Sequence, residues 1–405
     1  MHAPMDQFPI IDNQLHIGGI GVSRLAEQVG QTPFYAYDRR LISERAQQLR
    51  KALPQDIHLH YAIKANPMPE LVHHMATLVD GFDLASAGEM RVALTTDMPR
   101  DKISFAGPGK TDAELNAAIE AQVIINMESE SEMRRIGAIA GKLGVAPKVA
   151  IRINPDFELK SSGMKMGGGP KQFGVDAERV PDMLQELAGL PLDFFGFHVF
   201  SGSQNLKEES IMEAHEKTFD LALRMNEHVP SPVKLLNIGG GFGIPYFPGD
   251  KPLNLAPIGE NLARLLPRVK QALPQVEIVT ELGRFLVGEA GIYVCRVIDK
   301  KISRGETFLI TDGGLHHHLA ASGNFGQVIR KNYPVTIGNK AESLDKEIVH
   351  VVGPLCTPLD TLGSKMELPR ADVGDLVVVF LSGAYGFTAS PHLFLSHPLP
   401  KEVFV

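Results

Sequence analysis

One pattern limits what this chain can fold into: between about residues 57 and 281, short apolar runs alternate with longer stretches of helical periodicity. This alternation is typical of a parallel sheet whose strands are joined by crossover helices. Eight runs predict strands, at residues 58–63, 81–84, 102–106, 123–127, 149–153, 194–199, 234–238 and 277–280. Eight such units predict a closed (β/α)8 TIM barrel, with its active site at the C-terminal ends of the strands.

The pattern changes after residue 284. There the strand-like runs follow one another with few helical periods between them, at residues 288–301, 307–311, 347–352 and 375–381. A second, all-β domain in the C-terminal part explains this change. Residues 8–17 and 33–37 also predict strands, on either side of a short helix at 22–29, and we expect the N-terminal part to join the β domain.

The sequence therefore predicts two domains. The barrel is expected over residues 33–284, and the all-β domain over residues 1–32 and 285–405. Two domains are also the usual organisation for a chain of 405 residues. Residues 163–170 (GMKMGGGP) form a flexible-looking insertion after the fifth strand, where a barrel carries an active-site loop.

Composition argues against several classes of function. The net charge of −7 comes from scattered acids and bases, which offer no basic stripe for a nucleic acid. No apolar run reaches the roughly 20 residues that cross a bilayer, so we expect no membrane partner and a cytoplasmic location. Two cysteines without a Cys-x-x-Cys pair favour neither a disulfide framework nor a zinc site. The histidines at 316–318 are consecutive and point in different directions, so no metal is predicted.

Polar residues follow several of the predicted strands. The first strand continues into YAIKAN, in which Lys64 comes directly after apolar positions. A lysine there is either a desolvated amine suited to a Schiff base or a side chain that reaches out to solvent. The second strand carries Asp83, and the sixth continues into His198 and Ser201. A histidine packed in the core is the alternative interpretation of His198.

The last two strands end in a glycine run and in a pair of charged residues. Gly239, Gly240 and Gly241 leave backbone N–H groups uncovered, which suits an anion, and phosphate sites of barrels lie after strands seven and eight. A tight turn is the alternative. The eighth strand ends in ELGR, with Glu281 and Arg284, for which an exposed ion pair is the alternative. A phosphorylated carbonyl cofactor accounts for all of these groups together.

The order of the motifs resembles a known family. YAIKAN, FDLASAGE, HVFSGSQ, NIGGGFG, ELGR, GPLC and GAYG are similar, in that order, to the fold-type III pyridoxal-phosphate (PLP) decarboxylases, which include diaminopimelate, ornithine and arginine decarboxylases. The resemblance covers nearly the whole chain from about residue 8. It implies a PLP cofactor, and a TIM barrel with a C-terminal β domain of the alanine racemase and ornithine decarboxylase kind.

The resemblance also implies roles for individual residues. Lys64 would form the Schiff base, His198 would stack on the pyridine ring, and Glu281 would face the pyridine nitrogen. Cys356, from the other subunit of a homodimer, would return a proton to the α-carbon. Further residues expected to bind the cofactor are Asp83, Ser201, Gly239, Gly240, Gly241, Gly283, Arg284 and Tyr385. Those expected to bind the substrate are Arg284, Asn324, Thr357 and Tyr385.

Two motifs that determine specificity in the family are missing. Thr357 stands where diaminopimelate decarboxylases have Glu and ornithine decarboxylases have Asp, and a neutral Thr cannot hold a distal ammonium. The Arg-Pro-x-x-Tyr segment expected after Asp312-Gly313-Gly314 is absent, and the next arginine is Arg330. Leu282 also replaces the usual Pro, which leaves the spacing of Glu281 and Arg284 unchanged. Simple diaminopimelate and ornithine are therefore disfavoured as substrates.

The stretch HHHLAASGNF resembles a subgroup of these decarboxylases found in secondary-metabolite and exopolysaccharide or exosortase-associated gene clusters. Some members take amino acids that are attached to a carrier protein or otherwise derivatised, so the substrate expected here is an amino acid or a derivatised amino acid, with free and carrier-protein-bound forms both left open. A diaminopimelate decarboxylase proper remains an alternative. An amino-acid racemase would have an arginine at the pyridine nitrogen in place of Glu281. A non-catalytic regulator of the same fold would not need both Lys64 and Cys356.

Overall fold

The alternating segment folds as a closed barrel in the computed structural model of the chain, which describes residues 2–159, 164–327 and 329–405. In these ranges, eight parallel strands pair in a ring that the β8–β9 and β15–β5 pairings close, and a short strand β11 (Val175–Asp176) pairs with β9. The ring consists of β5 (Ile57–Ala62), β6 (Gly81–Leu84), β7 (Ile103–Phe105), β8 (Ile124–Met127), β9 (Lys148–Asn154), β12 (Asp193–Val199), β14 (Leu235–Gly240) and β15 (Glu277–Leu282). The predicted TIM barrel is confirmed.

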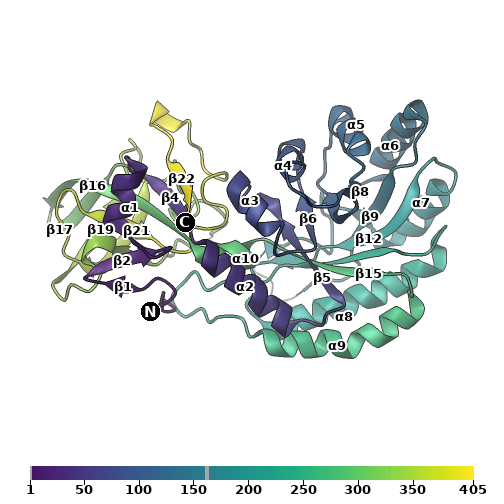
Figure 1. Cartoon of the computed structure of the whole chain (residues 1–405), viewed down its shortest axis with the longest axis horizontal. Helices are drawn as coiled ribbons and strands as arrows, with labels where there is room; N and C mark the ends of the chain where they lie inside the picture. Colours follow the sequence, from purple (N-terminus) through teal and green to yellow (C-terminus); the bar gives the residue numbers. More distant parts are fainter. Residues whose placement is uncertain (1, 160–163, 328) are drawn as a thin grey trace. The chain divides into compact units, whose positions relative to one another are not determined.

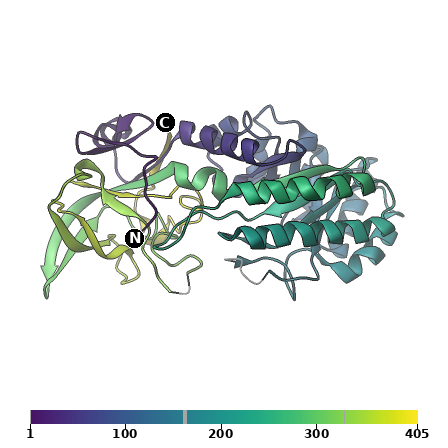
Figure 2. The same cartoon turned by 90° about the horizontal axis from the view of Figure 1, so that it is seen from below.

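Helices follow the strands and lie outside the ring, as Figure 1 shows. They are α3 (Pro69–Met75), α4 (Ala87–Ala93), α5 (Asp112–Glu120), α6 (Glu130–Leu143), α7 (Val180–Leu187), α8 (Glu208–Met225) and α9 (Leu255–Ala272). Side-chain caps begin several of them: Ser86 and Ser129 accept N–H bonds at α4 and α6, and Thr111 with Glu114 forms a capping box at α5. The long helices α8 and α9 lie side by side (Figure 2). Within the described ranges, no helix is long and apolar enough to span a membrane.

The barrel interior is layered. Ile124, Ala150, Leu235 and Val279 form a buried apolar layer, against which Phe195 packs. Toward the N-terminal ends of the strands, charged residues follow: the Lys102 ammonium pairs with the Glu277 carboxylate, and Lys148 and Lys234 lie over the Phe195 ring. Toward the C-terminal ends the inward side chains become polar again. An apolar layer therefore separates two polar ones.

The second compact unit comprises Met1–Arg45, Pro245–Pro252 and Leu286–Val405. Its main sheet has the order β18-β21-β16-β17-β19-β20, and β4 joins both β16 and β22. The strands are β4 (Phe34–Tyr37), β16 (Gly291–Ser303), β17 (Glu306–Thr311), β18 (Val335–Ile337), β19 (Lys346–Val352), β20 (Thr361–Pro369), β21 (Leu376–Val379) and β22 (Lys401–Phe404). The predicted β domain is confirmed, although β18, β20 and β22 were not expected.

The N-terminal residues form a small three-stranded sheet in this unit. The run 8–17, predicted as one strand, is interrupted, and β1 (Ile10–Ile11) turns into β2 (Gln14–Ile17) and β3 (Ile20–Gly21). The turn residues Asp12 and Asn13 have φ of 51° and 61°, a left-handed conformation that Asp and Asn tolerate better than most residues. The helix α1 (Val22–Val29) matches the predicted one.

Candidate active site

A buried carboxylate and a buried imidazole lie together near the C-terminal end of the barrel. Glu281 comes from β15 and His198 from β12, and Oε2 of Glu281 lies 3.2 Å from Nε2 of His198. Burial alone would raise the pKa of Glu281. His198, with Lys64 and Arg152 further away, outweighs burial and lowers that pKa to about 2. Glu281 is therefore a permanent negative charge in the barrel.

Asn237 on β14 fixes this carboxylate with its side-chain amide. Its Nδ2 donates to Glu281 Oε2 at 3.0 Å and to Asp83 Oδ1 at 3.4 Å. Its Oδ1 accepts the backbone N–H of Gly239 at 2.8 Å. Because an amide carries two N–H donors and one carbonyl acceptor, Asn237 can hold two carboxylates and the glycine run at once. It is 2% exposed, so these bonds are shielded from water.

Asp83 on β6 is also buried and receives donors from neighbouring strands. The Ser104 hydroxyl donates to Oδ1, and Nδ1 of His60 lies 3.3 Å from Oδ2. His60 in turn requires Gly81, because an added Cβ there would lie 2.3 Å from His60 Nε2. Asp83 thus lies inside the polar layer, where it supports Asn237, and we keep its contact with the cofactor as a prediction.

A second buried network ties the strand ends to each other. Arg152 on β9 pairs with Glu128 at 2.8 Å, and its guanidinium carbon lies 4.9 Å from the centre of the Phe173 ring. Glu128 also accepts the backbone N–H of Gly107 at 2.6 Å and of Gly174 at 2.8 Å. One carboxylate therefore holds the loops that follow β7 and β9.

Lys64 lies in the short helical turn Ile63–Ala65 that follows β5. Its Nζ is 5.5 Å from the centre of the Phe200 ring, which belongs to the loop after β12. The side chain is exposed, which agrees with the second of the two interpretations of Lys64, a side chain that reaches out to solvent. Gly283 lets this turn approach the end of β15, because an added Cβ would lie 2.8 Å from the Ala65 Cβ. Arg284 begins the short helix α10 (Arg284–Val287) that follows.

The glycine run after β14 is packed backbone to backbone. A Cβ on Gly240 would lie 2.0 Å from the Glu281 carbonyl oxygen, and one on Gly241 would lie 2.1 Å from that of Gly202. Gly239 and Gly241 have φ of 70° and 77°, which favours glycine. The run therefore presents bare backbone at the strand end, as a phosphate loop requires, although tight packing alone also demands these glycines.

The loop after β12 continues this edge. Ser201 accepts the backbone N–H of Met166 at 3.1 Å through its own carbonyl, and β13 (Gly202–Ser203) pairs with β10 (Met164–Lys165). The insertion predicted at 163–170 thus lies against the loop of Ser201, with residue 163 itself outside the described residues. Asn154 holds the insertion by donating to the Gly169 carbonyl at 2.9 Å.

Four of the predicted site residues lie in the β unit, namely Cys356, Thr357, Tyr385 and Asn324. Cys356 is exposed, and Thr357 follows it in the turn between β19 and β20. The Thr357 hydroxyl accepts the backbone N–H of Leu359 at 3.3 Å, as a threonine at a turn commonly does. Tyr385 is half-buried with φ of 53°.

Asn324, the fourth of these residues, stabilises its own loop. Its Nδ2 donates to Ser322 Oγ at 2.8 Å and to the Leu359 carbonyl at 3.3 Å. Arg330 donates to the carbonyls of Ser322 and Thr361, both at 2.9 Å, and burial lowers its pKa. Arg330 therefore binds backbone in this structure. Among the residues described, no group of three or more His, Cys, Asp or Glu has the geometry of a metal site.

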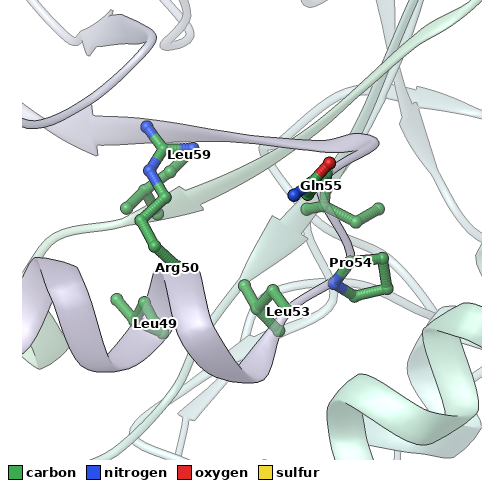
Figure 3. A pocket seen from close by; sticks show the side chains of 7 residues that line it. Leu49, Arg50, Leu53, Pro54, Gln55 and Leu59 are labelled. Carbon is green, nitrogen blue, oxygen red and sulfur yellow. The ribbon is translucent and has the colours of Figure 1, made fainter.

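A separate hollow of about 280 Å³ lies between the end of α2 (Arg39–Ala52) and the start of β5 (Figure 3). Its lining consists of Leu49, Arg50, Leu53, Pro54, Gln55, Ile57 and Leu59. It opens at the N-terminal end of β5, whereas Lys64 follows the C-terminal end. Its one cation, Arg50, already pairs with Asp80 at 2.6 Å. This hollow is therefore not the candidate active site.

Comparisons with known proteins agree with the geometry. Residues 39–288 match the family model described as "Pyridoxal-dependent decarboxylase, pyridoxal binding domain". The chain belongs to this family. It is a PLP-dependent amino-acid decarboxylase with a TIM barrel and a β domain.

Three proteins illustrate what this chain is similar to. The L-glutamyl-[BtrI acyl-carrier protein] decarboxylase of Niallia circulans is 38% identical over 92% of this chain and 88% of its own. The 2-[(L-alanin-3-ylcarbamoyl)methyl]-2-hydroxybutanedioate decarboxylase of Staphylococcus aureus is 30% identical over 95% and 96%. The crystal structure of diaminopimelate decarboxylase from M. jannaschii with L-lysine superposes with a TM-score of 0.89, at 26% identity over 98% and 92%.

Sequence reasoning gave no role to several residues of the polar layer, namely His60, Ser104, Glu128, Arg152 and Asn237. Strand register is the signal that could have found them. His198 stands in register with Arg152 on one side and with Asn237 on the other. Asp83 is in register with Ser104, and Glu281 with His60. Because residues in register on parallel strands face the same way, each known site residue identifies its neighbours.

Proposed function

We propose that Lys64 binds PLP as a Schiff base and that the enzyme decarboxylates an amino acid whose side chain carries a neutral acyl linkage, presented on a carrier protein. The observation that carries the decarboxylase chemistry is Glu281, a buried carboxylate whose pKa is held near 2. An ionised acid at this point suits a protonated ring nitrogen, whereas a racemase would need a cation there.

The residues present fit the cofactor. The Gly239–Gly241 run offers bare backbone at the end of β14 for a phosphate, with Ser201 on the neighbouring loop. Arg284 at the end of β15 supplies a cation for the same phosphate region, and Tyr385 would add a hydroxyl from the β unit. His198 offers an imidazole face and Lys64 an exposed amine.

When bound, PLP would supply an electron sink for the electron pair that departing carbon dioxide leaves on the α-carbon. The lowered pKa keeps Glu281 ionised at neutral pH, so its carboxylate would accept a hydrogen bond from the protonated ring nitrogen of bound PLP. Asn237 keeps that carboxylate in place through its 3.0 Å bond. The exposed Cys356 thiol donates the proton that replaces the carboxylate on the α-carbon.

We also propose a homodimer in which Cys356 and Tyr385 complete the site of the partner subunit. Mixing the inactive Lys64→Ala and Cys356→Ala proteins tests this arrangement, because one site of each mixed dimer then contains both intact residues. Recovery approaching a quarter of the original activity is expected. Absence of recovery after verified subunit exchange would show that each chain builds its own site.

The substrate class rests on the β unit and on two relatives. Thr357 is a neutral turn residue, which leaves no carboxylate at the position that holds a distal ammonium in related enzymes. The names of two relatives describe an amino acid joined through an acyl group, to a carrier protein in one and through a carbamoyl group in the other. A neutral acyl linkage is common to both.

Measuring carbon dioxide release from free amino acids, their side-chain acyl derivatives and carrier-protein thioesters tests this function. Acylated substrates should have kcat/KM above about 10⁴ M⁻¹s⁻¹, a usual value for a natural substrate. Free lysine, ornithine and meso-diaminopimelate should be poor. Efficient turnover of free meso-diaminopimelate would instead favour a diaminopimelate decarboxylase, like the enzyme of the M. jannaschii structure.

A further inference from the structure

The three consecutive histidines of the β unit are not equivalent. His317 places Nε2 at 2.9 Å from the Pro398 carbonyl and Nδ1 at 3.4 Å from the Tyr293 hydroxyl. His318 places Nε2 at 2.9 Å from Ser382 Oγ, and its Nδ1 accepts the Ala321 N–H at 3.3 Å. Both rings therefore have a partner on each nitrogen, which explains them as parts of the fold.

His316 differs from both. It is 0% exposed, and neither of its ring nitrogens has a hydrogen-bond partner among the described residues. The nearest rings are those of His317 and His397, whose centres lie 3.7 and 5.0 Å away. An unpaired buried imidazole is costly and needs an explanation, and a bound ligand that supplies the missing partner is one.

The chemistry of this position favours an uncharged ligand. Burial, followed by the neighbouring His397 and His392, lowers the pKa of His316 to about 4, so the ring is neutral at physiological pH. A neutral imidazole has one N–H donor and one acceptor nitrogen. A carboxylate placed beside it would be a buried charge without a cation, whereas a carbonyl oxygen needs only the N–H.

Asp360 connects His316 to the turn of Cys356. Its Oδ1 accepts the backbone N–H of Leu315 at 2.6 Å, and its Oδ2 accepts that of Leu355 at 2.8 Å. His316 and Cys356 each follow one of these residues directly. The Asp360 carboxylate therefore fixes both the turn that carries His316 and the turn that carries Cys356, the proposed proton donor.

We propose that His316 donates a hydrogen bond to the carbonyl oxygen of the substrate's neutral acyl linkage. This inference rests on the proposed function and adds the group that distinguishes an acylated side chain from a free one. Access requires movement of residues 391–400, which include His397. Leu395 and Ser396 there have left-handed φ of 56° and 60°, and Leu393 is 88% exposed. Such a movement breaks the hydrogen bond between His317 Nε2 and the Pro398 carbonyl, a cost that release of the strained backbone offsets in part.

The test compares two substrates in two proteins. The substrates are the N-acetylcysteamine thioester of the L-glutamate side chain and its thioether analogue, with a methylene in place of the side-chain carbonyl. The holoenzyme should prefer the thioester by about tenfold in kcat/KM, the size expected for one buried hydrogen bond. In His316→Phe, which keeps a ring but has no donor, that preference should disappear.

Two further variants separate recognition from folding. His316→Gln keeps one donor and one acceptor and should retain the preference, even if it loads less cofactor. His350→Phe is the matched control, because His350 stacks on Phe308 at 4.8 Å on β17 and β19 and has no role in the proposed site. It should leave the preference unchanged.

Each outcome bears on a different claim. Equal rates for the two analogues in the unmodified enzyme overturn the inference without any variant. A preference that survives in His316→Phe overturns it while the proposed function stands. If neither analogue is a substrate while a free amino acid is, the proposed substrate class is wrong and the inference falls with it.

Discussion

The barrel unit and the β unit hold their proposed site residues in different ways. In the barrel, His198, Asn237 and Glu281 project from parallel strands: His198 is in register with Asn237, and Glu281 lies 3.0 Å from Asn237 Nδ2 and 3.2 Å from His198 Nε2. In the β unit, Cys356 and Thr357 lie on a turn that Asp360 and the Thr357 hydroxyl hold through backbone N–H groups. A strand position is fixed by the whole sheet, whereas a turn can change with a few residues. The chemistry is therefore expected to be fixed in the barrel and the selectivity to vary in the turns.

Removing the amine of Lys64 is expected to have the largest effect, because no other group can take over its covalent bond. Lys64→Ala should lower kcat by roughly 10⁴-fold or more and abolish borohydride labelling of that peptide. Lys102→Ala, a change of the same kind at the other end of the barrel where Lys102 pairs with Glu277, should keep the label and most activity. Labelling of a different lysine in the unmodified protein would contradict the assignment.

Glu281→Gln is expected to have the second-largest effect, because it removes the charge of the side chain and keeps its shape. We expect kcat to fall about 10²- to 10³-fold, as for other buried electrostatic groups. The lowered pKa also predicts that the ionised Glu281 stabilises the folded protein at neutral pH. Because the folded pKa lies below the ordinary 4.5, this stability is present above pH 4.5 and is lost as the pH falls toward 2. Urea unfolding of both proteins across this range should show their free energies of unfolding converge; parallel curves would refute the shift.

The sequence predicts the barrel part of this comparison well. The strand at 81–84 was predicted at its observed bounds, as was the helix 22–29 of the β unit, because apolar periodicity defines both. Lys64, His198 and Glu281 follow from the rule that barrel sites lie at strand ends. The sequence left a desolvated and a solvent-reaching Lys64 as alternatives, because exposure depends on how loops from other strands cover a residue.

The β unit was less predictable. Strand β20 carries Gly363 and three charged or polar residues in its middle, so it lacks the apolar alternation that reveals a strand. Its pairing with β19 depends on a contact between segments, and that is not visible in either sequence alone. Likewise, nothing in the run of three histidines shows that His317 and His318 form hydrogen bonds within the β unit, whereas His316 forms none with the described residues.

Asn237→Asp tests how strictly the barrel layer is fixed. It would place a third carboxylate between Asp83 and Glu281 and remove both amide donors, so the free energy of unfolding should fall by about 3 kcal/mol. Asn116→Asp is the matched control, because Asn116 donates to Glu120 at 2.8 Å on an exposed helix face. It should cost about 0.5 kcal/mol or less. If urea unfolding shows similar decreases in the free energy of unfolding for the two variants, the buried layer is no more strictly fixed than an exposed helix face.

The smallest expected effect is a change of selectivity in the turn. Thr357→Glu should restore a carboxylate for a distal ammonium and raise kcat/KM for free meso-diaminopimelate by about tenfold, the value of a hydrogen bond to a charged group. Thr77→Glu, at an exposed position of the barrel unit, should leave it unchanged. If Thr357→Glu also leaves kcat/KM for meso-diaminopimelate unchanged, the turn does not determine substrate choice. The expectation that selectivity varies in the turns of the β unit is then wrong.

The apolar layer of Ile124, Ala150, Leu235 and Val279 is bypassed on one side by β5. His58 Nδ1 lies 3.2 Å from Glu277 Oε1, and His60 Nδ1 lies 3.3 Å from Asp83 Oδ2. Because alternate residues of a strand face the same way, the two imidazoles follow one another along β5. A change of charge at the Lys102–Glu277 pair is therefore expected to reach the catalytic layer along this strand, so the far end of the barrel cannot be recharged without consequence for the acid at its centre.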